Sequence, residues 1–375
     1  MRSGKGLSII AAALLLIVGA QRAQSEARRL YLSFLGDIMI HTVNYLTPDY
    51  GDIYSSLRPI LLRDTLSFAN LEFPVDPNRP YSSYPRFNAP REYLEAAVGA
   101  GIDVFSLANN HAVDQDVEGI AQTLRSLEEV GRGAFRRIYY QGTRQSLDTP
   151  FAPVEIRVKG ARVGFMAVTQ MVNWPMPGPY VHVVDYANRR HREYFLPQVA
   201  ALAEQYDLFI LSYHGGREYA PEPEEGKVRF FRQLIGAGVD IVYGHHPHVL
   251  QRYELVEREG GTGLILCSTG NLISGMIGHL GPEAENDPLA WTGDSALWLV
   301  VVRVEEGEAA IEEVTPLPIS NYRNRRGVTA VHTYGALAGE GLPEPWLNYY
   351  RGRHSSLRAL FRRWAGDHRI DRGGN

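Results

Sequence analysis

The sequence lacks the features that define several large classes of protein. It has one cysteine in 375 residues, so no disulfide can form within the chain. That residue, Cys267, lies in the apolar run Leu264–Cys267, where a small core side chain is more typical than a catalytic thiol. Basic residues are not in excess, because 38 Lys and Arg stand against 42 Asp and Glu, a formal net charge of -4. The charge balance therefore disfavours nucleic acid as a partner.

Long apolar runs and internal repeats are also scarce. No repeat occurs at a period of about 20–50 residues, which argues against a solenoid. The longest apolar stretch is Leu7–Ala20, which follows Arg2 and Lys5. At roughly 14 residues it is short for a membrane span and typical of a signal-peptide core. We therefore expect residues 1–25 to be the signal peptide of a protein exported to the periplasm or cell surface, with an uncleaved N-terminal membrane anchor as the alternative.

The rest of the chain alternates between short apolar runs and amphipathic stretches. Apolar residues recur at helical spacing over 117–130, 191–205 and 227–237. Seven runs have the length and composition of buried strands: Leu30–Leu35, Leu66–Leu71, Val104–Leu107, Val163–Val168, Leu208–Tyr213, Ile241–Tyr243 and Leu264–Cys267. Such alternation predicts an α/β fold built around a largely buried sheet.

The C-terminal part departs from this alternation. Ala296–Val304 and Ala309–Pro316 predict an antiparallel pair of strands. Beyond them, 351–372 is rich in arginine, and apolar residues recur there at helical spacing. We expect a main domain over 28–320 and a helical extension over 330–375 that docks its apolar face on that domain. Attachment of the extension to an anionic membrane or partner is the alternative.

Polar side chains follow six of the predicted strands. They are Asp37, Asn70 with Glu72, Asn110 with His111, His214, the three histidines of GHHPH (244–248), and Asn271. Because the carboxyl ends of strands in an open α/β sheet converge on one crevice, we expect these groups to meet in space. Taken singly, each has an ordinary structural explanation, such as a helix cap or a turn.

A bound metal explains why these residue types would gather. Carboxylates brought together repel one another unless a cation neutralises them. A mixture of oxygen and imidazole ligands suits Mn, Fe or Zn better than Ca or Mg. The sequence therefore predicts a transition-metal site at the strand ends.

The motif GHHPH places three imidazoles within five residues. Pro247 fixes the local backbone angle φ and separates His246 from His248. We expect an extended turn in which these two rings point to adjacent ligand positions, and a structural role for His245.

Asp114 follows His111 by three residues and has two interpretations. It could accept the ring proton of His111 and so fix the tautomer of that ring. It could equally be the N-cap of the helix that begins near Val117.

Six motifs together indicate a family. In order along the chain, GDIM, NLEFP, LANNHAVD, HGGREY, GHHPHVLQ and STGN resemble the motifs of the CapA family of poly-γ-glutamate capsule biosynthesis proteins. That family is similar in fold to the calcineurin-like metallophosphoesterases. The resemblance covers roughly Leu30 to Val304. It implies a four-layer α/β/β/α sandwich that holds two divalent metal ions at the strand ends.

The resemblance also implies roles for residues at the matching positions. Six residues would be metal ligands, divided between two ions that share one carboxylate: Asp37, Glu72 and His248 for the first ion, and Glu72, Asn110, His214 and His246 for the second. His111 would face the substrate and protonate a leaving group or stabilise charge, with Asp114 as its partner in catalysis.

Three positions depart from the family's pattern. Met39 stands where phosphoesterases carry a metal-binding histidine, a change that the capsule family shares. His41 is a candidate to replace that ligand. Gly215 stands in place of a tryptophan, and Asp116 in place of a glycine. These differences bear on substrate fit more than on metal binding.

Three hypotheses of function follow. The first is an exported metal-dependent hydrolase of the phosphoesterase type, acting on a phosphoester or anionic-polymer substrate in cell-envelope or capsular polymer metabolism. The second is a non-hydrolytic component of a membrane-associated complex that synthesises or exports poly-γ-glutamate. The third is an envelope protein in which the motifs serve only as scaffold.

Overall fold

The computed structural model describes residues 27–276, 280–284, 287–323, 329–337 and 339–367. The predicted signal peptide or anchor over 1–25 lies outside the described residues. Within the described part of the chain, no helix is both long enough and apolar enough to cross a membrane.

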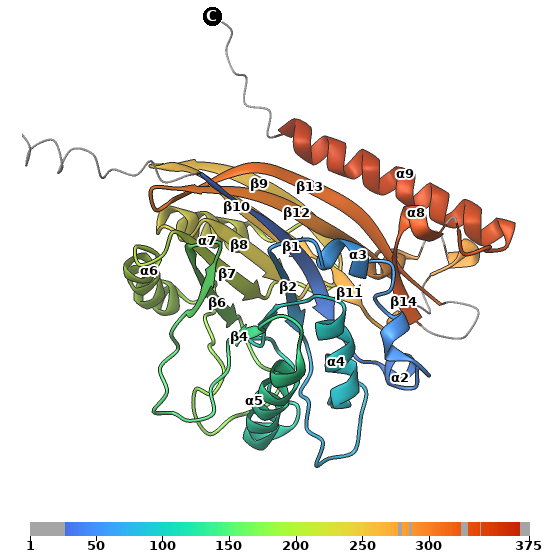
Figure 1. The fold of residues 1–375 in the computed structure, drawn as a ribbon, viewed down its shortest axis with the longest axis horizontal. Helices are drawn as coiled ribbons and strands as arrows, with labels where there is room; N and C mark the ends of the chain where they lie inside the picture. Colours follow the sequence, from blue (N-terminus) through green and yellow to red (C-terminus); the bar gives the residue numbers. More distant parts are fainter. Residues whose placement is uncertain (1–26, 277–279, 285–286, 324–328, 338, 368–375) are drawn as a thin grey trace, which may run out of the picture.

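The larger of two β-sheets has eight strands in the order β14-β13-β12-β1-β2-β3-β4, with β11 beside β1 (Figure 1). Its strands are β1 (Arg28–Ile38), β2 (Leu66–Leu71), β3 (Val104–Ser106), β4 (Tyr139–Gln141), β11 (Asn271–Ile273), β12 (Asp294–Glu305), β13 (Glu308–Arg323) and β14 (Thr329–Thr333). β1 to β4 run parallel, whereas β12, β13 and β14 are antiparallel to their neighbours.

The smaller sheet has six strands in the order β5-β6-β7-β8-β10-β9. They are β5 (Val154–Val158), β6 (Ala161–Thr169), β7 (Leu208–His214), β8 (Ile241–His245), β9 (Leu250–Arg258) and β10 (Gly261–Thr269). The inner four are parallel, and β5 and β9 are antiparallel edges. All seven predicted runs and the predicted antiparallel pair are therefore strands. The sequence analysis missed β5 and β9, whose edge positions leave several side chains partly exposed, and the short strands β4, β11 and β14.

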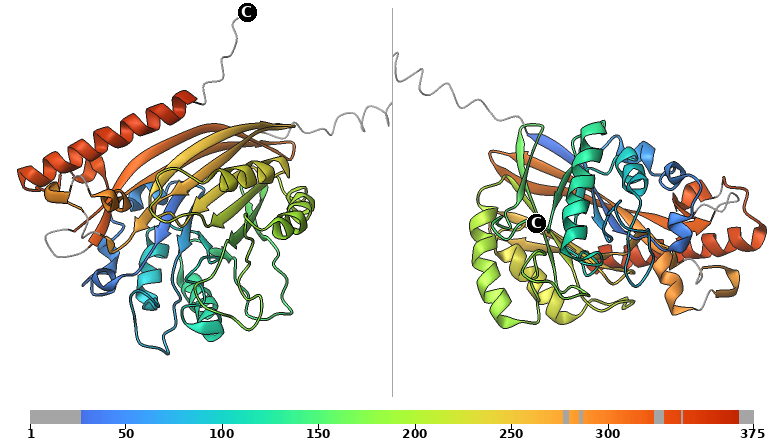
Figure 2. Two further views of the ribbon diagram at one scale, coloured as in Figure 1. Left: turned by 180° about the vertical axis from the view of Figure 1, so that it is seen from behind. Right: turned by 90° about the horizontal axis from the view of Figure 1, so that it is seen from below.

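Helices lie outside both sheets, which confirms the predicted α/β sandwich (Figures 1 and 2). α4 (Arg91–Gly99) and α5 (Asp116–Gly133) lie beside the larger sheet, and α6 (Arg189–Ala203) and α7 (Glu225–Gly236) beside the smaller one. The short helices are α2 (Thr42–Tyr45), α3 (Arg58–Leu61) and α8 (Tyr334–Leu337). The three predicted helical stretches match α5, α6 and α7 to within a few residues.

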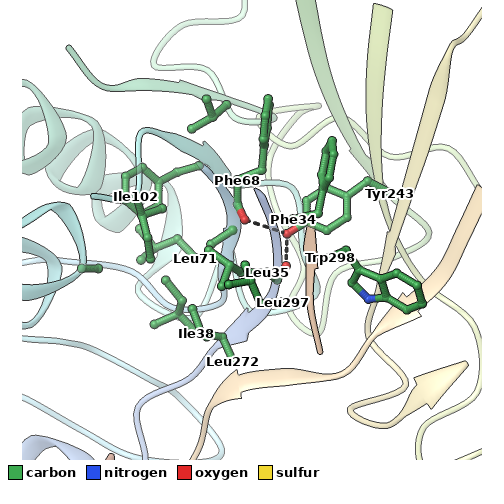
Figure 3. Packing of buried hydrophobic residues seen from close by; sticks show 14 of the residues in the cluster. Phe34, Leu35, Ile38, Phe68, Leu71, Ile102, Tyr243, Leu272, Leu297 and Trp298 are labelled. Carbon is green, nitrogen blue, oxygen red and sulfur yellow. Dashed lines mark hydrogen bonds between the residues drawn. The ribbon is translucent and has the colours of Figure 1, made fainter. Parts of the chain in front are cut away.

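Aromatic side chains fill the space between the two sheets (Figure 3). The ring of Phe34 stacks on Phe68 with centroids 4.8 Å apart and meets the edge of Tyr243 at 5.1 Å. The Tyr243 hydroxyl donates to the carbonyl of Leu35 and, at 3.2 Å, to that of Phe68. Loss of one such ring to alanine would cost about 3–5 kcal/mol. This interior therefore fixes β1 and β2 against β8, the strands that lead to the polar residues.

The last helix, α9 (Glu344–Asp367), packs its apolar face on the outside of the sheets, as predicted (Figure 2). Leu357, Phe361 and Trp364 are buried, and the Phe361 ring centroid is 5.9 Å from that of Trp298 in β12. Before α9, β14 pairs with β13, so the chain after residue 329 begins with a strand of the larger sheet.

A glycine brings β1 close to the segment that carries Asn271. A Cβ atom at Gly36 would lie 2.0 Å from the carbonyl oxygen of Gly270 and 2.9 Å from the amide nitrogen of Leu272. The next residue, Asp37, donates its amide to the same Gly270 oxygen at 2.9 Å. Both close neighbours are backbone atoms, so they cannot turn aside as a flexible side chain would.

Replacing Gly36 by alanine should therefore push β1 away from β11 and displace Asp37. We expect Gly36→Ala to lower the free energy of unfolding by about 2–3 kcal/mol. Gly133→Ala is the control, because a Cβ atom there has no neighbour within 4 Å. Urea denaturation of both variants tests this, and equal stability of the two would contradict it.

Candidate metal centre

The structure brings the predicted polar residues together at one rim, where parallel strands of both sheets end. Asp37 is the penultimate residue of β1, Glu72 directly follows β2, and His214 ends β7. His246 and His248 lie in the turn that follows β8. All of these side chains are buried.

Potential ligand atoms form two groups that share one carboxylate. The first group is Asp37, Glu72 and His248, and the second is Glu72, His214 and His246. Within each group the ligand atoms all lie within 4.8 Å of one another. The amide oxygen of Asn110 lies 2.7 Å from His214 Nε2, which places it beside the second group. This cluster could bind metal.

Glu72 is the residue whose environment most requires a cation. It is fully buried, and its Oε1 atom has no hydrogen-bond partner. That oxygen lies 3.6 Å from Nε2 of His214 and 3.7 Å from Nε2 of His248. Burial, and then the charge of Asp37, raise the pKa of Glu72 well above its ordinary value. Because a buried carboxylate oxygen without a partner is costly, a cation shared between the groups fits this position.

Asp37 is held in the ionised form by two histidines. Burial alone would raise its pKa, but contacts with His245 and His248 lower the pKa well below its ordinary value. His248 Nδ1 lies 3.3 Å from Asp37 Oδ2. His245 Nδ1 lies 2.9 Å from Oδ1, although the two atoms are not in hydrogen-bonding geometry. The structural role expected for His245 is consistent with this position behind the carboxylate.

The imidazoles differ in protonation. Burial, and then the charge of His248, lower the pKa of His246 to about 3. Burial likewise lowers the pKa of His214 well below its ordinary value, so both rings are neutral near pH 7, as metal ligation requires. Burial would also lower the pKa of His248, but Asp37 raises it instead. A metal at His248 would therefore compete with a proton for the ring.

The turn that carries His246 and His248 is not the extended turn that the sequence analysis predicted. The φ angles of these residues are 92° and 58°, in the left-handed region that non-glycine residues rarely adopt. Each such residue costs about 1–3 kcal/mol, which the surrounding structure must offset. The two rings have centroids 5.9 Å apart; His248 belongs to the group of Asp37 and Glu72, and His246 to the group of Glu72 and His214.

His111 lies near the ligand groups, with Asp114 as its partner. His111 Nδ1 and Asp114 Oδ2 are 2.7 Å apart. Asp114 Oδ2 also accepts from the Phe87 amide at 2.8 Å, and Oδ1 accepts from Trp174 Nε1 at 3.0 Å. α5 begins at Asp116 with Gln115 as N-cap residue, so the N-cap interpretation of Asp114 is wrong.

Several residues at the site carried no assigned role in the sequence analysis. The Asn70 amide donates to Asp37 Oδ1 at 2.9 Å and to Glu72 Oε2 at 3.2 Å, and so holds both carboxylates. Asn271 Oδ1 lies 2.9 Å from His248 Nδ1. Glu218 is exposed and forms a further possible ligand group with His246 and His248. Trp174 comes from the loop NWPMPGP over residues 173–179, which the motifs do not include.

The departures from the family's pattern now have local explanations. Asp116 has a φ angle of 59°, a conformation that glycine adopts without strain, and its carboxylate meets Arg79 at 3.1 Å. A Cβ atom at Gly215 would lie 2.7 Å from Gln170 Cβ, so a larger residue would displace Gln170. His41 does not join either ligand group, because its Nδ1 accepts from the Gly275 amide at 3.0 Å.

The fold and site define a class: an α/β sandwich with a cluster of potential metal ligands where the strands of both sheets end. Residues 31–276 match the family described as bacterial capsule synthesis protein PGA_cap. The chain belongs to this family, as its motifs had indicated.

Three relatives show how the similarity extends. The chain is 25% identical over 336 residues to the capsule biosynthesis protein CapA of Bacillus anthracis, covering 84% of this chain and 75% of that protein. It is 26% identical over 307 residues to the PGA biosynthesis protein CapA of Bacillus subtilis, covering 76% and 71%. It is 27% identical over 232 residues to a probable polyglutamine synthesis accessory protein of Mycobacterium tuberculosis, covering 60% and 57%.

A buried cation lies behind the cluster. Lys227 is fully buried, and its Nζ atom has no hydrogen-bond partner. A Cβ atom at Gly216 would lie 3.2 Å from this Nζ atom. Burial lowers the pKa of Lys227 to about 8, only partly opposed by the charges of neighbouring groups.

Removal of this charge should stabilise the protein. Below pH 8 the lysine is protonated in both the folded and the unfolded state. A lowering of its pKa from 10.5 to about 8 therefore costs the folded state about 3 kcal/mol. We expect Lys227→Met to raise the free energy of unfolding by up to that amount at pH 7. The gain should shrink between pH 8 and 10.5, where only the unfolded state keeps the proton. Denaturation at pH 7 and pH 10, with exposed Arg229→Met as control, measures it; a loss of stability at pH 7 would refute it.

Proposed function

We propose that this chain is an exported, metal-dependent hydrolase of the phosphoesterase type that acts in capsular or cell-envelope polymer metabolism. The observation that carries the proposal is Glu72, a buried carboxylate shared by two groups of potential ligands. Two relatives are named as capsule and PGA biosynthesis proteins, and these names supply the biological setting.

The ligand groups suit two divalent cations. Asp37, Glu72 and His248 would hold one, and Glu72, His214 and His246, with Asn110 beside them, would hold the other. Mixed oxygen and imidazole donors favour Mn, Fe or Zn. When bound, such a pair supplies Lewis acidity and lowers the pKa of water, so that hydroxide is available near neutral pH.

His111 is placed to move a proton. Asp114 Oδ2 accepts from His111 Nδ1, which leaves Nε2 as the ring atom that can act on a substrate. From this atom the ring can donate a proton to the departing oxygen. Trp174 and the Phe87 amide hold Asp114 in this orientation.

The surroundings of His111 suit an anionic substrate. The centroid of the Phe87 ring lies 4.6 Å from that of the His111 ring. The preceding residue, Arg86, places its guanidinium 4.0 Å from the centroid of the Trp174 ring. The Arg86 side chain is partly exposed and meets Asp116 only at 3.9 Å. Its positive charge therefore remains available to a phosphate or carboxylate.

Metal analysis and a hydrolysis assay test the proposal. The purified chain should contain a first-row metal and hydrolyse a generic phosphodiester, such as bis-p-nitrophenyl phosphate, when supplied with Mn, Fe or Zn. Protein that binds metal but hydrolyses neither this ester nor p-nitrophenyl phosphate would count against hydrolysis. Protein that binds no metal under any of these conditions would refute the metal centre itself.

Substitution of His111 separates catalysis from metal binding. We expect His111→Ala to lower the rate by about 10²–10⁴-fold, because the proton donor is lost, while the bound metal stays unchanged. Trp174→Phe, which removes one donor to Asp114, should lower the rate by about tenfold. Elemental analysis of each variant beside the rate measurement provides the control, and loss of metal from His111→Ala would contradict the assigned role.

A non-hydrolytic role in polymer synthesis is the second candidate, and Met39 favours it. Met39 stands where phosphoesterases carry a ligand, and His41 is engaged with Gly275 instead. The mycobacterial relative is named as a probable accessory protein of polyglutamine synthesis. Under this candidate, the chain binds metal and anionic polymer without turnover, and His111→Ala changes neither.

A further inference from the structure

The two sides of α9 have opposite character. One side carries Tyr350, Leu357, Phe361 and Trp364, all buried against the rest of the protein. The other side is exposed and carries Arg351, Arg358 and Arg362. These three are spaced by seven and four residues, which places them along one face of the helix. We call them the arginine face.

In the part of the chain that the structure describes, no carboxylate pairs with the arginine face. No Asp or Glu occurs between residues 345 and 366. Within the described residues, the α9 arginine that has a carboxylate partner is Arg353, on the buried side, which pairs with Asp294. On the other helices that the structure describes, some exposed arginines pair within their own helix: Arg125 with Glu118, Arg189 with Glu193 and Arg229 with Glu225. Arg132 of α5 and Arg190 of α6 are exposed without such a pair, but they stand singly and do not form a row.

This arrangement does not help the helix itself. Like charges at positions i and i+4, such as Arg358 and Arg362, destabilise a helix by about 0.2–0.5 kcal/mol. Adjacent Arg363 is also exposed and adds a further positive charge. A partner that brings negative charge would offset this repulsion.

The residues between the arginines decide which kind of partner fits. Ser355, Ser356 and Ala359 are small and exposed. The large apolar side chains beside them, Leu357, Phe361 and Trp364, are buried in the protein, and exposed Trp346 lies at the other end of α9. A helix that binds a membrane surface inserts an apolar face, and the stretch of α9 that carries the arginines presents none. The net charge of -4 disfavours nucleic acid. An extended polymer with closely spaced carboxylates matches a row of guanidinium groups.

We propose that the arginine face of α9 is a docking site for a linear, carboxylate-rich polymer, separate from the metal centre. The face spans about 16 Å from Arg351 to Arg362, at 1.5 Å per residue, so it would contact several units of the chain at once. α9 lies along the outside of β13 (Figures 1 and 2), and none of its residues belongs to the groups of potential ligands. The identity of the polymer rests on the proposed function, whereas the existence of the site rests on α9 alone.

Binding of fluorescently labelled poly-γ-glutamate to the full chain, followed by anisotropy in about 20 mM salt, tests the proposal. The triple variant Arg351→Gln, Arg358→Gln, Arg362→Gln should bind at least tenfold more weakly. The control is the triple variant Arg63→Gln, Arg132→Gln, Arg190→Gln, which removes the same charge from exposed arginines elsewhere. The control should bind within twofold of the wild type. Binding should also fall steeply between about 20 and 200 mM salt, because exposed charges are screened.

Three results would overturn the proposal. They are no binding by the wild type, equal loss in the two triple variants, and binding to phosphatidylglycerol vesicles in preference to the polymer. Hydrolysis by the wild type, measured separately, keeps this test apart from the proposed hydrolase. A wild-type chain that lacks hydrolytic activity but still binds polymer through the arginine face would refute the hydrolase and leave the docking site supported.

Discussion

The rest of the site depends on one constraint, which is the burial of two carboxylates beside several closely spaced histidines. Asp37 and Glu72 are both fully buried and belong to ligand groups within 4.8 Å, where two negative charges would repel strongly without compensation. The protein compensates Asp37 with histidines, and the raised pKa of Glu72 marks the carboxylate that is left uncompensated. A divalent cation resolves this conflict more completely than a proton, because it also satisfies His214 and His246.

Such a cluster can exist only on a rigid support. The aromatic interior between the sheets, centred on Phe34, Phe68 and Tyr243, fixes the strands that end in Asp37, Glu72 and the GHHPH turn. Rigidity also allows the left-handed backbone at His246 and His248, which local preference would not produce. Stability from ordinary packing is thus what allows an unfavourable arrangement of charge and backbone to persist at the rim.

The sequence predicted much of this because two of its signals are local. Apolar runs mark buried strands wherever both faces are covered, and the residue after each run is fixed by chain connectivity. The other features depend on tertiary contact. Asp114 could have capped α5 until Trp174 and Phe87, distant in sequence, were seen to hold it against His111. The edge strands β5 and β9 were missed because several of their side chains are only half-buried, so their apolar runs are interrupted. β4 and β11 have three residues each, too few to show a pattern in the sequence.

Met39 affects how open the first ligand group is. Position 39 has no histidine, and His41 accepts a hydrogen bond from Gly275 instead. The potential ligands of the first group are therefore Asp37, Glu72 and His248. Structural metal sites are closed by their protein ligands, whereas catalytic sites keep a position open for water or substrate. A group of three ligands therefore suits exchange of water or substrate better than a purely structural role. The same openness would lower the affinity of the first ligand group for its ion. Whether that group is occupied at the metal concentration around the protein therefore decides between hydrolysis and binding without turnover.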